Sequence, residues 1–321
     1  MPPDGTPLRV RALRVVLIAV VLQTLFVFFF LVPAHDPKPN GFPVAVAGEA
    51  PAVERFTARL LERADFDVQQ VASAAEGRAL VEDRDVYGTF VLGPRGVERV
   101  ITASAASLPA AQIVEEIGRA AGARSVEDVR RLAPGDPRGV ALNVIVLPLV
   151  ITAILAALMA VNLVPDLDLR GRFGLTALAG LLGGLIAVAL ANWWRDALPG
   201  PWLAEAGVIA LAVLAIALVS AGIIRLIGPA GTVVPFLLFL MIGNPASGVA
   251  SAPELLPTPW NPVGQLLPPG ALGSALRGTA YFDGAGVVFP IVVLLAWAAL
   301  GVWLVALSGR RGAAAAGAPR P

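Results

Sequence analysis

Residues 139–164 read GVALNVIVLPLVITAILAALMAVNLV, with no charged side chain among them. A helix rises ~1.5 Å per residue, so about 20 apolar residues cross the ~30 Å hydrocarbon core of a bilayer. This stretch is therefore predicted to span a membrane, and it decides the fold class that we expect. Charge is concentrated elsewhere, because residues 33–138 hold 29 of the 47 charged side chains.

Further apolar runs of similar length lie on both sides of this stretch, at 15–32, 174–194, 205–224, 230–248 and 286–308. The run at 15–32 is longer than the ~7–15 apolar residues of a cleaved signal peptide, so we interpret it as a span. The run at 230–248 is interrupted by Pro235 and is expected to form a tight helical hairpin with the run before it. The sequence thus predicts a multi-pass α-helical membrane protein with about six spans.

The arginines of the short segments predict the orientation of these spans. With six spans, one face carries the arginines of both tails, of the loop at 165–173 and Arg225, whereas the short loops of the other face have only Arg195 and Arg277. Basic residues favour the cytoplasmic side of short loops. The predicted organisation is a cytoplasmic tail at 1–14, a first span at 15–32, an extracytoplasmic domain at 33–138, a five-span membrane domain at 139–308 and a cytoplasmic tail at 309–321.

The predicted extracytoplasmic segment has the patterns of a small α/β domain. Val53, Phe56, Leu60 and Leu61 form one apolar helical stripe, and the Gly-Pro-Arg-Gly sequence at 93–96 suits a turn between two strands. The patterns predict strands at 42–47, 66–71, 86–92 and 97–102, a helix beginning at Pro51, and further helices at 75–85 and 110–122.

The composition argues against catalysis. The chain has no cysteine and one histidine, His35, which we interpret as a hydrated residue beside the membrane. We therefore predict no metal site, no cofactor, no nucleic-acid partner and no enzymatic activity. The only lysine, Lys38, lies between two prolines, so the chain cannot contain the phosphate-binding loop of an ATPase.

The predicted spans have almost no ionisable side chains at membrane depth. Glu205 and Arg225 lie at the ends of the fourth span, where we expect their side chains to reach the interface. Ion-driven carriers usually need such groups within the membrane. This disfavours self-energised transport and leaves an external energy source, or no transport. In the third span, Gly180 and Gly184 form a small-xxx-small pair, which predicts close packing on another helix of the bundle or in a homodimer.

The segment at 244–285 is apolar yet rich in proline, so no continuous helix is expected through it. We expect it to lie along the outer interface or to dip back into the membrane, with a short helix at 271–282. Because Pro245 disfavours helical geometry at the residue before it, the fifth span is predicted to end at Asn244. Asn244, Pro245, Ser247 and Gly248 are predicted to form a functional turn.

Several of these features resemble the type-2 class of ABC exporter permeases, in particular the actinobacterial branch related to phage-infection-protein-like and nitrosoguanidine-resistance-like membrane proteins. One span, a large outer domain and five further spans is that family's layout. The phrases that carry the resemblance are DVYG at 85–88, TASAAS at 102–107, GNPASG at 243–248, and LPPGA at 267–271 followed by Arg277 and Tyr281-Phe282.

The resemblance implies a permease subunit that exports a lipophilic or envelope-related compound and is energised by a separate ABC ATPase. The expected partners are membrane lipid, that ATPase and a second copy of the chain. A non-transporting cell-envelope scaffold or receptor that acts through its outer domain is the alternative. The presence or absence of an ATPase partner separates the two.

Overall fold

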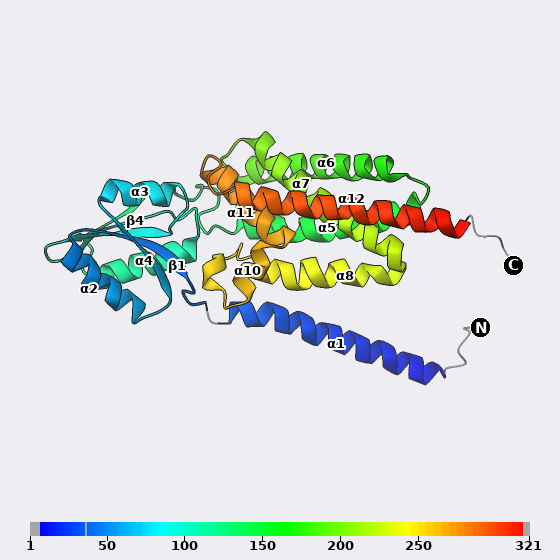
Figure 1. Ribbon diagram of the computed structural model, residues 1–321, viewed down its shortest axis with the longest axis horizontal. Helices are drawn as coiled ribbons and strands as arrows, with labels where there is room; N and C mark the ends of the chain where they lie inside the picture. Colours follow the sequence, from blue (N-terminus) through cyan, green and yellow to red (C-terminus); the bar gives the residue numbers. More distant parts are fainter. Residues whose placement is uncertain (1–6, 36, 317–321) are drawn as a thin grey trace.

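The computed structural model describes residues 7–35 and 37–316, and it combines a long helical bundle with a small α/β domain at one end (Figure 1). Both ends of the described chain lie at the opposite end of the bundle. The long helices are α1 (Leu8–Ala34), α5 (Ala141–Leu163), α6 (Leu169–Arg195), α7 (Trp202–Ile227) and α12 (Val288–Ala316).

Within the described residues, six helical segments are long and apolar enough to cross a membrane, which confirms the predicted number. The fifth of them in chain order is a composite segment at residues 229–246, made of η1 (Pro229–Thr232), α8 (Val233–Pro235), the π-helix η2 (Phe236–Gly243) and α9 (Asn244–Ala246). The helices extend beyond the apolar runs. Helix α1 begins within the predicted tail at 1–14, and α12 continues into the predicted tail at 309–321. Residues 1–6 and 317–321 of these tails lie outside the described residues.

The α/β domain contains a five-stranded sheet with the order β2-β1-β3-β4-β5. Strand β1 pairs in parallel with β2 and β3, β3 and β4 form an antiparallel hairpin, and β5 is parallel to β4. Helix α3 covers one face, and α2 and α4 cover the other (Figure 1). The elements are β1 (Phe42–Ala47), α2 (Ala50–Leu61), β2 (Phe66–Val71), α3 (Ala74–Glu82), β3 (Gly88–Gly93), β4 (Gly96–Thr102), α4 (Leu108–Ala120) and β5 (Ser125–Asp128).

Alternation along β1 explains how the sheet is covered. Val44 and Val46 join the hydrophobic cluster beneath α2 and α4, whereas Ala45 and Ala47 join the cluster on the α3 face. That second cluster continues without a break into the helical bundle. The small domain therefore shares a hydrophobic core with the bundle.

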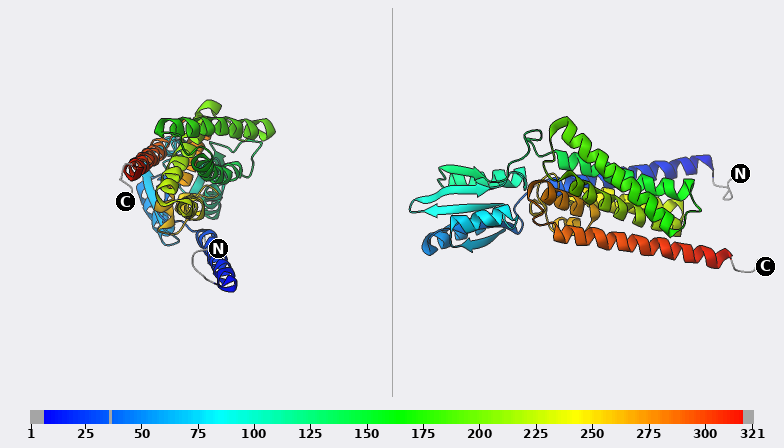
Figure 2. Two further views of the ribbon diagram at one scale, coloured as in Figure 1. Left: turned by 90° about the vertical axis from the view of Figure 1, so that its right-hand side faces the viewer. Right: turned by 90° about the horizontal axis from the view of Figure 1, so that it is seen from above.

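Helix α7 lies at the centre of the bundle and packs against α5, α6 and α12. Helix α1 is peripheral and diverges from the other helices along its length (Figures 1 and 2). It is held near its carboxyl end, where the Phe29 ring meets the Trp260 ring edge-on with centroids 5.6 Å apart.

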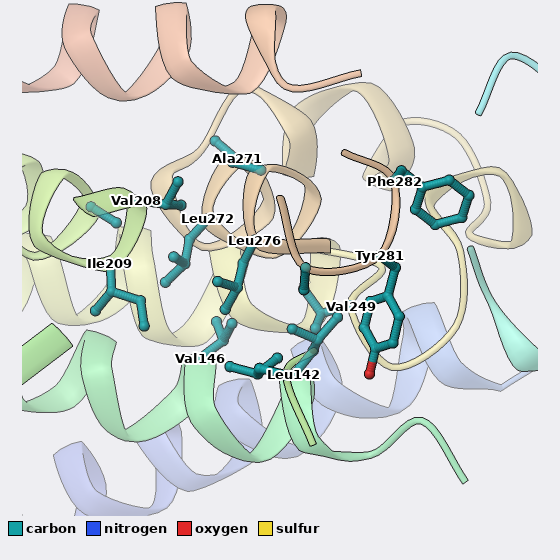
Figure 3. Close-up of a cluster of buried hydrophobic side chains, with 14 of the residues drawn as sticks. Leu142, Val146, Val208, Ile209, Val249, Ala271, Leu272, Leu276, Tyr281 and Phe282 are labelled. Carbon is teal, nitrogen blue, oxygen red and sulfur yellow. The ribbon is translucent and has the colours of Figure 1, made fainter. Parts of the chain in front are cut away.

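The proline-rich segment folds into η3 (Pro253–Leu255), α10 (Trp260–Gln265) and α11 (Pro268–Tyr281). Helix α11 is buried on nearly every side, because it packs against α5, α7 and α12. Figure 3 shows Leu272 directed toward α7 and Leu276 toward α5. The prolines at 268 and 269 occupy the first turn of α11, where a missing amide hydrogen costs nothing. Its backbone is therefore shielded by protein, as an apolar non-spanning segment requires.

Side chains of the α/β domain connect it to this segment. Tyr87 donates a 2.6 Å hydrogen bond from its hydroxyl to the Glu254 carboxylate. Arg84 has a left-handed backbone conformation (φ 66°). It donates from Nη1 to the carbonyls of Ser274 (3.1 Å) and Ala285 (3.3 Å). These contacts fix the domain over the end of the bundle that contains α11.

Candidate functional site

The fifth span does not end at Asn244, so that prediction is wrong. The helix continues through Pro245 and ends at Ala246. A proline in an α-helix clashes with the carbonyl four residues before it. The π-helix at 236–243 has wider turns, with bonds to the fifth residue back, and it leads directly into this position. The altered spacing lets the helix pass through Pro245.

The chain turns immediately afterwards. Ser247 donates from Oγ to the Asn244 carbonyl at 2.6 Å, and its Oγ accepts a hydrogen bond from the Val249 amide at 3.3 Å. Gly248 has φ +66°, which side chains rarely tolerate, and a Cβ there would lie 2.6 Å from the Pro253 nitrogen. The turn therefore requires glycine for two reasons, its backbone angle and the close approach of the next segment.

A hollow of about 330 Å³, which we call the turn hollow, lies beside this turn. The end of α1 contributes Phe30 and Pro33 to its walls, and α5 contributes Leu147. Asn143 and Asn244 bring two amide side chains to the otherwise largely apolar lining. The predicted functional turn is thus at the edge of a space between the first span and the bundle.

A second, smaller hollow of about 90 Å³ lies between the α/β domain and the bundle, and it shares Val249, Ala250 and Ser251 with the turn hollow. We call it the arginine hollow, because Arg277 of α11 lines it. The Arg277 side chain is 6% exposed and donates from Nη2 to the Val249 carbonyl at 2.8 Å. Burial lowers the pKa of Arg277.

A third and larger space, the side groove, has a volume of about 850 Å³ and runs between α5 and α6. These helices both pack against α7 and hardly touch one another, which leaves the groove open to the side. Asp136 and Arg138 line both the side groove and the arginine hollow. The three spaces therefore form a row around the amino end of α5.

The ionisable side chains next to this row have pKa values that are shifted by burial and by one another. Burial, and next the charge of Arg277, lower the pKa of Arg84 to about 10. Burial, and next the charge of Glu254, raise the pKa of Tyr87 well above its usual value. Burial raises the pKa of Tyr281 to about 12, and its hydroxyl donates to the Ala197 carbonyl at 2.8 Å. At neutral pH Arg84 therefore stays charged and Tyr87 and Tyr281 stay neutral, so the site is a fixed electrostatic environment.

Glu205 lies at the end of the fourth span as predicted, but the expectation that its side chain extends outward is wrong. Glu205 is completely buried at the start of α7, and its Oε1 accepts a 3.1 Å hydrogen bond from the Gly200 amide. Oε2 has no hydrogen-bond partner within the described part of the chain. The loop before α7 folds back over the carboxylate, and a hydropathy profile contains no signal for that.

Gly180 and Gly184 lie against α7. A Cβ on Gly180 would be 2.9 Å from the Ala210 carbonyl oxygen, and one on Gly184 would be 2.6 Å from the Ala206 carbonyl oxygen. Gly183, between them, has open space where its Cβ would be. The pair thus permits close helix contact within one chain.

Comparison with known protein families, with curated proteins and with solved structures finds no match for this chain. Sequence reasoning found the turn at 244–248 but missed the arginine hollow, since Arg277 was assigned to a short outer loop. An arginine on a helix of small residues (LGSALRGTA, 272–280) was the available signal that this side chain is enclosed.

Proposed function

We propose that this protein is a membrane permease subunit that exports a lipophilic or envelope-related compound and is energised by a separate ATPase. The observation that carries the proposal is the side groove. An apolar groove of about 850 Å³, open between two candidate spans, suits a compound that enters sideways from a bilayer. It adjoins the arginine hollow and the turn hollow at the end of the bundle next to the α/β domain.

The distribution of charge supports an external energy source. No ionisable side chain lies in the central turns of any of the six candidate spans. Arg172 and Arg225 are near one end of the bundle, and both donate to the Pro165 carbonyl. Since these two side chains brace the loop between α5 and α6, the loop suits transmission of force from an ATPase.

The proposed topology places this loop and both termini in the cytoplasm and residues 33–138 outside the cell. The arginine distribution supports that orientation. The α/β domain and the ends of the described chain lie at opposite ends of the bundle, as an even number of spans requires (Figure 1). The turn at 244–248 would then lie at the outer mouth of the path.

Affinity purification tests the proposal. Cells that express the tagged chain are cross-linked before the membranes are dissolved in mild detergent, and copurifying proteins are identified. We expect an ABC ATPase in stoichiometric amount. Recovery without any nucleotide-binding protein would refute the permease proposal and favour a scaffold or receptor. In a receptor, the contacts of Arg84 and Tyr87 could transmit ligand binding, because they connect the α/β domain to α11 and the segment before it.

The turn has its own test. Asn244→Leu should fold normally, because the residue is helical and lines the turn hollow, but it should lose export. Gly248→Val is expected to misfold because of the 2.6 Å contact and the positive φ, so it serves as the structural control. Full export by Asn244→Leu would show that the turn only ends a helix and has no role in export.

A further inference from the structure

We propose that the arginine hollow and the side groove together form one binding site for a single-chain amphiphile with an acidic head group. The head group would occupy the arginine hollow, and the hydrocarbon chain would lie in the side groove. The inference rests on the proposed function, since it names the class of compound that the permease would carry.

The arginine hollow is rich in hydrogen-bond donors. Arg277 has five N–H donors, and its hydrogen bond within the described residues, to the Val249 carbonyl, uses only Nη2. Arg277 is 6% exposed and forms no ion pair with a carboxylate of the described chain, although the charge of Glu254 acts on it from a greater distance. A buried guanidinium without a directly paired counter-ion is costly. An anionic ligand in the hollow would compensate it.

The other groups around the hollow also favour an anion. Ser107 accepts from the Ala110 amide through Oγ, which leaves its hydroxyl hydrogen available, and Gln112 adds an amide. Asp136 is the only carboxylate in the lining. Each of its oxygens accepts one backbone hydrogen bond, Oδ1 from the Val140 amide (3.0 Å) and Oδ2 from the Ala141 amide (2.9 Å). Arg277 and Arg138 in the same lining disfavour a cation, whereas a phosphate or carboxylate would find several donors.

The side groove provides the complementary apolar surface. Its walls include Val144, Ile145 and Pro148 on α5 and Ala187 and Leu190 on α6. The lining on α5 extends from Ala141 to Leu149, a length of about 12 Å along a helix. This is a surface for an extended alkyl chain, and it begins at the arginine hollow.

Arg138 lies at the junction of the two spaces, where a charged head group meets its hydrocarbon chain. Its side chain is exposed, and no ion pair or hydrogen bond of it is found within residues 7–35 and 37–316. Arg138 and Arg277 together outweigh Asp136, the one carboxylate in the lining, so one end of the apolar groove carries a net positive charge. That asymmetry selects an anionic amphiphile over a neutral lipid or a second protein helix.

Binding to the purified full chain in phosphatidylcholine nanodiscs tests the site. The probe is radiolabelled oleoyl lysophosphatidic acid, and the competitors are lysophosphatidylcholine, oleyl alcohol and inorganic phosphate. We expect saturable binding of one lysophosphatidic acid per chain. Lysophosphatidylcholine and oleyl alcohol should compete at least about tenfold less well, as the loss of one charged hydrogen bond implies. Inorganic phosphate should compete weakly because it lacks the chain.

Two variants separate the halves of the site. Arg138→Gln removes an exposed charge and should weaken binding about tenfold, whereas Arg124→Gln, an equal charge change at an exposed position of the α/β domain, should not. Val144→Trp should fill the groove and weaken binding similarly, and Val292→Trp on the exposed face of α12 is its control.

Equal competition by lysophosphatidylcholine, or unchanged binding in both Arg138→Gln and Val144→Trp, would overturn the inference. Strong competition by inorganic phosphate would also overturn it, because it would show an anion site without a chain site. The assay needs no ATPase. A bound lysophosphatidic acid without a copurifying ATPase would therefore refute only the permease proposal, and the reverse result would refute only this inference.

Discussion

Helices α1 and α7 are nearly alike in sequence character and opposite in environment. Their most apolar windows have mean hydropathies of 3.0 and 2.7, yet none of that window is buried in α1 and 72% is buried in α7. The difference lies in side-chain size. Helix α1 has no glycine and carries Phe26, Phe28, Phe29 and Phe30, whereas α7 and its neighbours have Ala and Gly where backbones meet. Hydropathy thus identifies a span, and small residues identify its place in the bundle.

Among the glycines of α6 and α12 that face α7, Gly301 of α12 has the most α7 atoms within 3 Å of the place of a Cβ, so the comparison predicts the largest effect there. A Cβ there would lie 2.6 Å from the Leu218 Cβ and 2.7 Å from the Val219 amide nitrogen. Gly301→Leu should lower the free energy of unfolding by at least ~3 kcal/mol, the upper end of typical overpacking costs. Gly309→Leu on the same helix has open space and should change it little. Unfolding by SDS in mild detergent measures the stability of both variants. Equal stability of Gly301→Leu and Gly309→Leu would contradict the central packing of α7.

The contact of α6 with α7 should be less sensitive. Gly180→Leu and Gly184→Leu should each lower the free energy of unfolding by about 1–3 kcal/mol, because both glycines approach backbone atoms of α7. Gly183→Leu is the matched control in the same turns, with nothing near its Cβ. If all three variants behaved alike in the same unfolding assay, this face of α6 would not pack on α7.

A pair of identical substitutions compares the two helices directly. Ile216 of α7 is 1% exposed and Ile18 of α1 is 60% exposed. We expect Ile216→Ala to cost about 1–2 kcal/mol of unfolding free energy. This is below the ~2–5 kcal/mol of water-soluble cores, because the unfolded helix stays in lipid and the transfer contribution is small. Ile18→Ala should cost less than ~0.5 kcal/mol. A similar loss in both would mean that α1 packs in the bundle.

The smallest effect is a loss of stability at the junction with the α/β domain, and it occurs only at high pH. Tyr87 and Tyr281 are the only two tyrosines, and both have raised pKa values, about 12 for Tyr281. Their contribution to stability should be complete below pH ~10, the usual phenol pKa, and be lost as the pH rises through about 12. Phenolate absorbance of the folded protein should therefore be absent at pH ~10 and appear there in denaturant. Half-ionisation of the folded protein at pH ~10 would show that the junction is open to water.

Features of the fold that depend on local sequence could be predicted, whereas those that depend on distant contacts could not. Strands at 42–47 and 66–71 were predicted with their observed bounds, since alternation and short turns determine them locally. Strand β5 (Ser125–Asp128) was missed because its sequence, SVED, has no apolar run and forms only by pairing with β4. The end of the fifth span was misplaced because the π-helix alters the local rule for proline.

The candidate site was less predictable than the fold. The turn at 244–248 has a local glycine and proline signal, so the sequence indicated it. The surroundings of Arg277 and Glu205 come from segments distant in the sequence, such as Val249 beside Arg277. Local patterns contain no information on such contacts. Buried charges in apolar segments are therefore the features for which the structure adds most.

The central claim is a six-span protein whose α/β domain and termini face opposite sides of the membrane. The absence of cysteine allows a direct test with a membrane-impermeant thiol reagent on intact cells. The cysteines belong at exposed positions, Ala58 on α2 and Asp166 between α5 and α6. We predict that Ala58→Cys is labelled on intact cells and Asp166→Cys only after permeabilisation. Labelling of both on intact cells, or the reverse pattern, would contradict the account.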